Sequence, residues 1–214
     1  MGNSKMQYLN VQLTGLTGRP HPVLHNILTT QDAKKLRLHL KFLTSDFLTN
    51  ERKAIDNPTL SPDCTLCNAP TDSIEHVMLS CLSTSEVRGR LFEELMKEVA
   101  KVQPSCSILQ FHPPASVLTQ FVLDCTSLNL PDSIRIPMHN PGISAIFRIS
   151  RDWCYAVSSE RSRLLRKLAK LKAKTTSSDN NQIRAELSFF RTIVNKYRGE
   201  YCYNLSKRCS FVIG

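Results

Sequence analysis

The feature that most constrains this chain is a cluster of metal-ligand residue types in the stretch CTLCNAPTDSIEHVMLSC. Three cysteines and one histidine occur with the spacing Cys64-x2-Cys67-x8-His76-x4-Cys81. Two cysteines separated by two residues can direct both sulfurs toward one point, and the Asn-Ala-Pro that follows favours a tight turn. The next residues predict a short helix that carries His76 and ends near Cys81. This pattern predicts a loop and a short helix joined by one metal ion.

The four residues predict a structural zinc site with the ligands Cys64, Cys67, His76 and Cys81. A Cys3His set fills all four positions of tetrahedral zinc and leaves none for a reacting water. With neutral imidazole the site has a formal charge of −1, so it does not itself attract phosphate. The alternative interpretation is a set of buried thiols with a hydrogen-bonded histidine. The other five cysteines contain no second pair with x2 spacing and are interpreted as core or surface thiols.

Hydrophobic periodicity predicts a mostly α fold. Apolar residues at helical spacing indicate helices over residues 29–48, 85–103, 115–125 and 143–157, and Trp153 in the last of these is expected in the core. The stretch SSERSRLLRKLAKLKAK predicts a basic amphipathic helix, and Ile183 to Tyr197 predict a final one. We therefore expect a small helical zinc-knuckle subdomain, followed by a helical region that ends in a basic antiparallel helix pair.

The same features divide the chain into four segments. Residues 1–28 form an N-terminal extension, and 29–103 form the helical segment with the zinc knuckle. Residues 104–142 form a proline-rich connector with a short helix, and 143–214 form the basic helical region. Each boundary is an expectation from composition and periodicity alone.

The net positive charge lies in the last third of the sequence. Residues 1–147 contain 13 Lys+Arg and 13 Asp+Glu, whereas residues 148–214 contain 15 and 5, which is the whole net charge of +10. Such asymmetry favours a polyanionic partner, usually nucleic acid. The predicted phosphate contacts are Arg161, Arg163, Arg166, Lys167, Lys170, Lys172 and Lys174.

Several function classes lack their signatures. The sequence has no His-x-Glu for a zinc deaminase, no adjacent aspartates for a polymerase metal pair and no glycine-rich phosphate loop. We expect no enzymatic activity from this chain alone. With no long apolar run and no secretory signal, we also expect no membrane association and an intracellular protein of the nucleus or cytoplasm.

Several phrases of the sequence resemble the C-terminal region of LINE-type non-LTR retrotransposon polyproteins, downstream of the reverse transcriptase domain. They are GRPHPVL, TTQDAKKLRLHLKFL, CTLC, EHVMLSC, FVLDCTSLNLPDSIRI and IFRISRDWCYAV, and they cover about residues 18 to 157. The resemblance implies a zinc knuckle that binds element RNA or target DNA during target-primed reverse transcription, beside a reverse transcriptase domain. The chain departs from that family in carrying neither the polymerase aspartates nor an endonuclease.

We therefore expect a non-catalytic, zinc-stabilised module that binds RNA or DNA. One alternative is a protein interaction module, in which the zinc element and the helix pair form the docking surface. Another is a decayed fragment with no present role.

Overall fold

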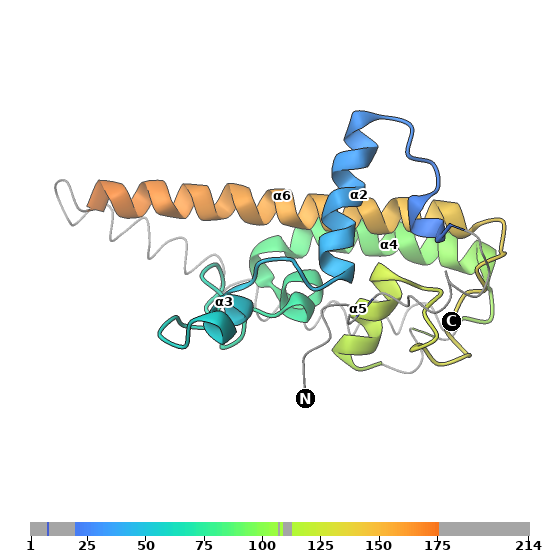
Figure 1. The fold of residues 1–214 in the computed structure, drawn as a ribbon, viewed down its shortest axis with the longest axis horizontal. Helices are drawn as coiled ribbons and strands as arrows, with labels where there is room; N and C mark the ends of the chain where they lie inside the picture. The colour runs from blue at the N-terminus through green and yellow to red at the C-terminus, as the bar shows by residue number, and fades with distance from the viewer. Residues whose placement is uncertain (1–7, 9–19, 107, 109–112, 176–214) are drawn as a thin grey trace.

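The structure is a computed structural model that describes Tyr8 and residues 20–106, 108 and 113–175. Within these ranges the chain is helical and contains no strand, which confirms the mostly α prediction. Its elements are η1 (Pro22–Leu24), α2 (Thr30–Leu43), α3 (Asn50–Asp56), η2 (His76–Ser80), η3 (Leu82–Thr84), α4 (Ser85–Val102), α5 (Ala115–Leu123) and α6 (Ile143–Thr175). Figure 1 shows α6 as the long axis of the molecule.

Helix α6 is one straight helix of 33 residues, about 50 Å long. The sequence predicted two elements here, one over 143–157 and a basic one after it. The helix is continuous because no glycine or proline interrupts Ile143–Thr175. Its first half is apolar on the buried face and its second half is basic, so the two patterns describe two environments of one helix.

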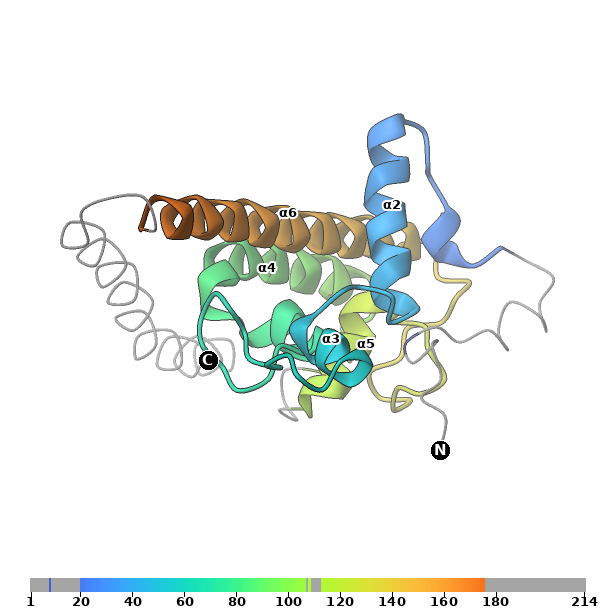
Figure 2. The ribbon, with the colours of Figure 1, turned by 60° about the vertical axis from the view of Figure 1, so that its left-hand side comes forward.

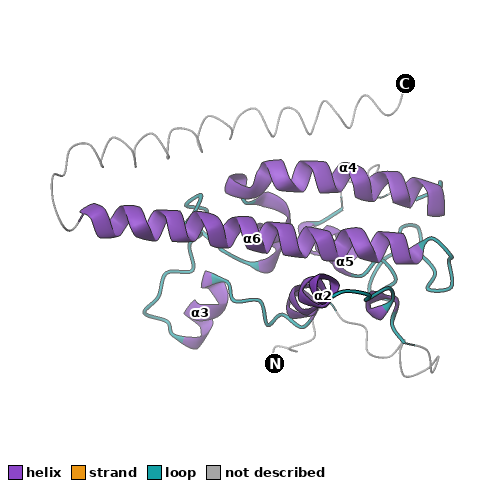
Figure 3. Ribbon diagram, turned by 90° about the horizontal axis from the view of Figure 1, so that it is seen from above, coloured by secondary structure: helices purple, strands orange, loops and turns teal. Residues whose placement is uncertain are grey.

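The other long helices pack on the first half of α6. Helix α4 runs antiparallel beside α6, and α2 crosses α6 steeply (Figures 1 and 2). Viewed from above, α2 and α3 lie on one side of α6 and α4 lies on the other (Figure 3). The C-terminal part of α6 extends past the start of α4 at Ser85 and is therefore not covered by α4 (Figure 3).

Local signals explain where α2 begins and ends. Thr29 caps the helix, because its side chain accepts the backbone N–H of Asp32 and the Asp32 carboxylate accepts the N–H of Thr29 in return. The helix ends at Leu43, earlier than the predicted residue 48, and Ser45 then takes a positive φ of 57°. Phe47 folds back and its ring stacks on Phe42 with centroids 4.0 Å apart.

One hydrophobic core joins α2, α4, α5 and α6. Its largest fully buried side chains include Phe42, Leu95, Phe121, Phe147 and Trp153. Trp153 is 2% exposed, and its indole N–H donates to the carbonyl of Met78 at 3.3 Å, which confirms its predicted place in the core. Through Met78 the metal segment is therefore connected to the main core.

The segment before α2 contributes to this core, although the sequence suggested only an extension. Tyr8 is buried, and its hydroxyl donates to Glu75. The His21 ring lies 3.3 Å from the carboxylate of Asp124, with both side chains buried. Arg151 of α6 donates to the carbonyl of Val23 at 2.9 Å. These polar contacts fix the start of the described chain against α5 and α6.

The last predicted helix, Ile183 to Tyr197, lies outside the described residues, so the antiparallel helix pair remains a prediction. Among the described residues, no helix combines the length and the apolar character that crossing a bilayer requires.

Candidate metal centre

The four predicted ligands converge on one point. Their ligand atoms all lie within 4.8 Å of one another. The sulfurs of Cys64 and Cys81 are 3.9 Å apart, as are those of Cys67 and Cys81, and the Cys67 sulfur is 3.3 Å from Nε2 of His76. All three cysteines of the cluster are available as ligands beside His76, because the described cysteines form no disulfide.

These distances fit a tetrahedral metal ion. Zinc bound at about 2.3 Å from sulfur and about 2.0 Å from nitrogen places its ligand atoms about 3.8 Å apart for two sulfurs and about 3.5 Å for sulfur and nitrogen. The sulfur separations of 3.9 Å and the sulfur–nitrogen separation of 3.3 Å lie close to both values. Cys64, Cys67, His76 and Cys81 could therefore hold one metal ion without a change of backbone.

Backbone hydrogen bonds close the loop that carries the first two cysteines. The N–H of Cys64 donates to the carbonyl of Ala69 and the N–H of Asn68 donates to the carbonyl of Cys64, both at 2.8 Å. Asn68 has a positive φ of 57°, which asparagine tolerates better than most residues. The N–H of Asp72 donates to the carbonyl of Pro62 at 2.8 Å. These bonds thus hold both sulfurs on the same side of the loop.

The second pair of ligands lies on one short helix, as predicted. The hydroxyl of Ser73 accepts the backbone N–H of His76 at 3.1 Å, so Ser73 caps this helix. The helix is wound as a π-turn over His76–Ser80 and ends at Cys81. The wider turn places His76 and Cys81, five residues apart, on the same face.

His76 has a partner on its second ring nitrogen. The hydroxyl of Ser80 lies 3.2 Å from Nδ1, on the side away from the sulfurs. With Nε2 directed at the metal position, Nδ1 carries the hydrogen and donates it to Ser80, and this bond fixes the tautomer that a metal ligand needs.

The four side chains of the cluster share protons through hydrogen bonds with one another. Hydrogen bonds from Cys67 and Cys81 lower the pKa of Cys64. Burial disfavours the charged form of His76, but its hydrogen bonds to Cys64 and Cys67 outweigh burial and raise the pKa of His76 to about 9. A metal ion must displace these protons, so its binding is expected to weaken as pH falls.

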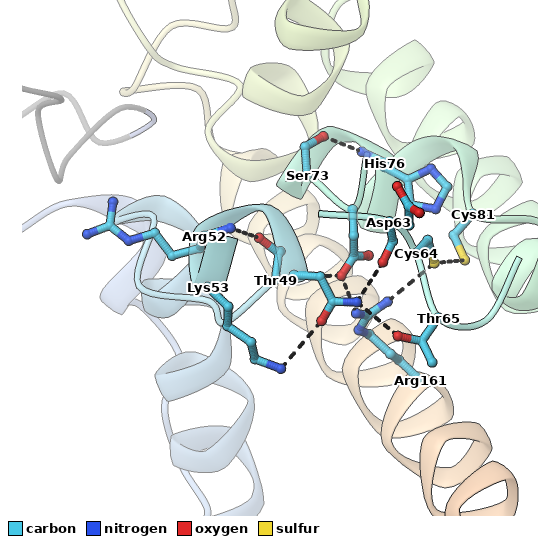
Figure 4. Close-up of polar contacts among 12 residues, drawn as sticks. Thr49, Arg52, Lys53, Asp63, Cys64, Thr65, Ser73, His76, Cys81 and Arg161 are labelled. Atoms are coloured by element: carbon cyan, nitrogen blue, oxygen red, sulfur yellow. Dashed lines mark hydrogen bonds and ion pairs between the residues drawn. The ribbon is translucent and has the colours of Figure 1, made fainter. Parts of the chain in front are cut away.

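Three helices from distant parts of the sequence support the cluster. The side-chain amide of Asn50, at the start of α3, donates to the carbonyl of Asp63 at 2.7 Å and to the hydroxyl of Thr65 at 2.9 Å. Arg88 of α4 is buried and donates to the carbonyl of Cys81 at 2.5 Å. Arg161 of α6 extends from its helix toward Cys64 (Figure 4).

Arg161 corrects one prediction. It was expected to contact phosphate, but its side chain is buried, with the residue 6% exposed. Its Nη2 lies 2.6 Å from the carboxylate of Asp72, and its Nη1 lies 3.9 Å from the sulfur of Cys64. On the next turn, Leu164 packs against Cys64, Leu66 and Cys81. Arg161 therefore belongs to the metal centre, and α6 is anchored to it.

The other predicted phosphate contacts lie on the part of α6 that extends beyond this anchor. Arg163, Arg166, Lys167, Lys170 and Lys172 are exposed. Arg163 pairs with Glu160 on the same helix at 2.6 Å. Lys174 lies within the helix, but its side chain is outside the described part of the structure.

Four residues of this centre were not predicted from the sequence. They are Asn50, Arg88, and the ion pair of Asp72 with Arg161. None lies at a spacing that marks a ligand-supporting residue, and Arg161 is 89 residues from Asp72. The only signal in the sequence is that Arg161 lies on the helical face of Leu164 and Leu168, where a charged residue is unusual.

Comparison with known proteins gives no relatives: no family model, no curated protein and no solved structure matches this chain.

Proposed function

We propose that this chain is a non-catalytic nucleic-acid-binding module that a structural zinc ion stabilises. The observation that carries the proposal is the position of the exposed basic half of α6, which begins directly after its anchor at the metal centre. The resemblance to the region downstream of the reverse transcriptase in LINE-type polyproteins supports the same function, with element RNA or target DNA as the ligand. The proposed role is to assist RNA or DNA binding in target-primed reverse transcription.

Zinc is the metal that the ligand set favours. Three thiolates and an imidazole are soft and borderline ligands, which suit zinc and exclude magnesium or calcium, and the near-tetrahedral separations agree. Because all four positions would be filled by protein, the ion would order the fold and would not activate water. Elemental analysis of purified protein tests this, and we expect one zinc per chain, lost in the double variant Cys64→Ser, Cys67→Ser.

The charge of α6 supports phosphate binding. From Ser158 to Thr175 the helix carries seven Lys+Arg and a single carboxylate, Glu160. Three of the exposed cations, Arg163, Arg166 and Lys170, follow at i, i+3 and i+7 on one face. Contacts of this kind would recognise phosphate and would carry no sequence preference.

A salt series tests the nucleic-acid proposal. If about five cations contact phosphate, log affinity should fall against log salt with a slope of roughly −3.5 on a single strand or −4.5 on a duplex. The triple variant Arg163→Glu, Arg166→Glu, Lys170→Glu should weaken binding to all sequences alike. The matched control is Arg90→Glu, Lys97→Glu, two exposed cations of α4 on the other side of α6. A salt-independent affinity would contradict the proposal.

A second candidate function is protein binding, and one observation favours it. Leu48, Ile55 and Leu60 are 60%, 57% and 46% exposed in and around α3, beside the metal loop. A set of large exposed apolar side chains within one short segment is a feature of interaction surfaces. Capture of a partner that survives nuclease treatment, and that is lost in Leu48→Ser, Ile55→Ser, would favour this function over nucleic-acid binding.

A further inference from the structure

The crossing of α2 over α6 places a second helix beside the basic half of α6. Lys35 of α2 forms an ion pair with Asp152 of α6 at 2.6 Å. The next turn of α6 is held as well, because the hydroxyl of Tyr155 hydrogen bonds with Gln31 of α2 and with Ser159. Helix α2 therefore stands against α6 immediately before the basic half begins (Figure 1).

The contacts also show which side of α2 faces that basic half. Arg151 of α6 has Asp32 of α2 as an electrostatic neighbour, whereas Tyr155, one turn later, has Gln31, Lys34 and Lys35. Asp32 of α2 is therefore nearer to the N-terminal half of α6, and Lys34 is nearer to its basic C-terminal half. Lys41 follows Lys34 at i+7 and lies on the same side of α2. Both lysines are exposed.

The exposed cations of α6 lie on the same face of the helix as Tyr155, which contacts α2. Tyr155, Ser159, Arg163, Arg166 and Lys170 succeed one another at steps of three or four residues, so they form one face of the helix. The face begins where α2 touches it and becomes basic at Arg163. From this spacing and these contacts we expect Lys34 and Lys41 of α2 to face Arg163, Arg166 and Lys170 of α6 across one corner, which we call the α2/α6 corner.

Both sides of this corner are fixed. Helix α2 is held by Phe42 and Leu43 in the core, and α6 is anchored just before its exposed cations, by Trp153 in the core and by Arg161 at the metal centre. Cations on such a frame keep their mutual distances, which suits phosphates that are themselves fixed in space, as in a double helix.

The described part of the surface has no exposed aromatic ring of the kind that single-strand binding uses. Proteins that bind single strands stack bases on exposed aromatic rings. In the described part of the chain, the large apolar side chains that are exposed are all leucine or isoleucine, and no aromatic ring is among them. Tyr155, the aromatic residue nearest the corner, is half-buried with its hydroxyl engaged.

We propose that the α2/α6 corner binds the phosphate backbone of a nucleic-acid duplex, with Lys34 and Lys41 on one side and Arg163, Arg166 and Lys170 on the other. This inference rests on the proposed nucleic-acid function and adds both a ligand class and a second helix to it. Double-stranded DNA and RNA present the same phosphate charge, and they are separate arms of the test.

The test compares a duplex of about 16 base pairs with each of its separated strands, for DNA and for RNA, using the full chain loaded with zinc. We expect the duplex to bind at least tenfold more tightly than either strand at the same salt. The variant Lys34→Glu, Lys41→Glu should lose at least tenfold in duplex affinity and reduce the salt slope by about 2, since each phosphate contact contributes about 0.9. The pair Arg90→Glu, Lys97→Glu has the same change of charge on α4 and should have a clearly smaller effect.

The possible results distinguish the proposed nucleic-acid function from the inference about the α2/α6 corner. Single strands that bind as tightly as the duplex overturn the inference, and so does an equal loss in the α2 pair and the α4 pair. In both cases the proposed function stands if the triple variant of α6 still abolishes binding. Absence of salt-dependent binding to any of the four ligands overturns the function and the inference together. Thermal unfolding of every variant, monitored by circular dichroism, identifies any loss of affinity that comes from misfolding.

Discussion

Arg161 and Asp72 form a buried ion pair, with Nη2 2.6 Å from Oδ2, that connects α6 to the metal-binding loop. The same oxygen of Asp72 accepts the backbone N–H of Asn50 at 2.8 Å, so one carboxylate joins the loop, α3 and α6. Burial raises the pKa of Asp72, although Asn50 and Arg161 oppose that change. The carboxylate therefore depends on its partners to remain charged inside the protein.

Removing the cation should cost more than removing the pair. In Arg161→Met, the buried carboxylate of Asp72 loses its partner, and we expect the free energy of unfolding to fall by about 3–5 kcal/mol. Adding Asp72→Asn removes the unpaired charge and keeps an acceptor for Asn50, so the double variant should be more stable than Arg161→Met and should lose less than the sum of the two single losses. Urea unfolding of the four zinc-loaded proteins measures this, and strictly additive losses would show that the two side chains do not interact.

Ser80 is predicted to strengthen metal binding without touching the metal. Its hydroxyl lies 3.2 Å from Nδ1 of His76, and Ser80→Ala would leave that nitrogen without this partner. Loss of such a partner typically weakens metal affinity by about 10- to 100-fold. Competition with a chromophoric chelator measures the change. Ser83→Ala is the matched control, because Ser83 donates to the carbonyl of Leu66 and contacts no ligand, and it should bind zinc like the wild type.

Metal removal should be visible at Trp153, the only tryptophan of the chain. Its indole N–H donates to the carbonyl of Met78, which lies in the ligand-bearing turn His76–Ser80. When a chelator removes zinc, this turn loses its fixed ends, and we expect water to reach the indole and its fluorescence to shift to longer wavelength. Stability should fall as well, by up to about 10 kcal/mol if the ion contributes as in small zinc modules.

Two variants separate metal loss from a general effect of the chelator. Cys64→Ser, Cys67→Ser should emit like the chelated wild type even without chelator. Cys106→Ser removes a half-buried thiol outside the cluster and should keep both the zinc and the wild-type emission. An emission spectrum that is identical with and without bound zinc would contradict the predicted connection between the metal turn and the core.

Local features could be predicted from the sequence because their causes are local. The cap at Thr29, the starts of α4, α5 and α6 near residues 85, 115 and 143, and the four metal ligands all follow from spacing within one or two turns. The C-terminal end of α2 and the continuity of α6 could not be predicted in this way. A change from an apolar to a basic pattern resembles a boundary between two helices. In α6 the pattern changes because the first half packs in the core and the second half is exposed to solvent.

Long-range contacts could not be predicted in the same way. Nothing near Arg161 in the sequence indicates a partner 89 residues away, and its neighbours Arg163 and Arg166 suggest an exposed basic helix. Helix α3 was missed because it has only seven residues, none of them buried, so it leaves no periodic apolar pattern. Its position depends on the Asn50 contacts with the metal loop, which only the fold reveals.

His39 should make the protein sensitive to mild acid. Its ring is fully buried in α2, and Nε2 donates to the carbonyl of Leu123 at 2.7 Å. Burial is the main cause that lowers the pKa of His39 to about 4, aided by the positive charge of Arg151 and opposed by the Leu123 hydrogen bond and Asp124. In the unfolded chain the imidazole has a pKa of about 6.5.

The sign of the effect follows from these two values. Between about pH 6.5 and pH 4 the unfolded chain binds a proton at this residue and the folded protein does not, so stability falls as the pH falls. The full contribution is present above pH 6.5, about 2 kcal/mol is lost at pH 5, and about 3 kcal/mol is lost at pH 4. The metal centre also loses stability in acid, because protons compete for its ligands, and the test must separate the two.

Comparison with His39→Gln provides that separation, because glutamine can donate to Leu123 and does not titrate. Between pH 7 and pH 5 the free energy of unfolding should fall by about 2 kcal/mol less in His39→Gln than in the wild type, while the acid sensitivity of the metal centre is common to both. His25→Gln, at an exposed imidazole, is the matched control and should keep the wild-type pH dependence. Urea unfolding at half-unit pH intervals gives the three curves. Parallel curves for His39→Gln and the wild type would show that His39 is not held neutral by the fold.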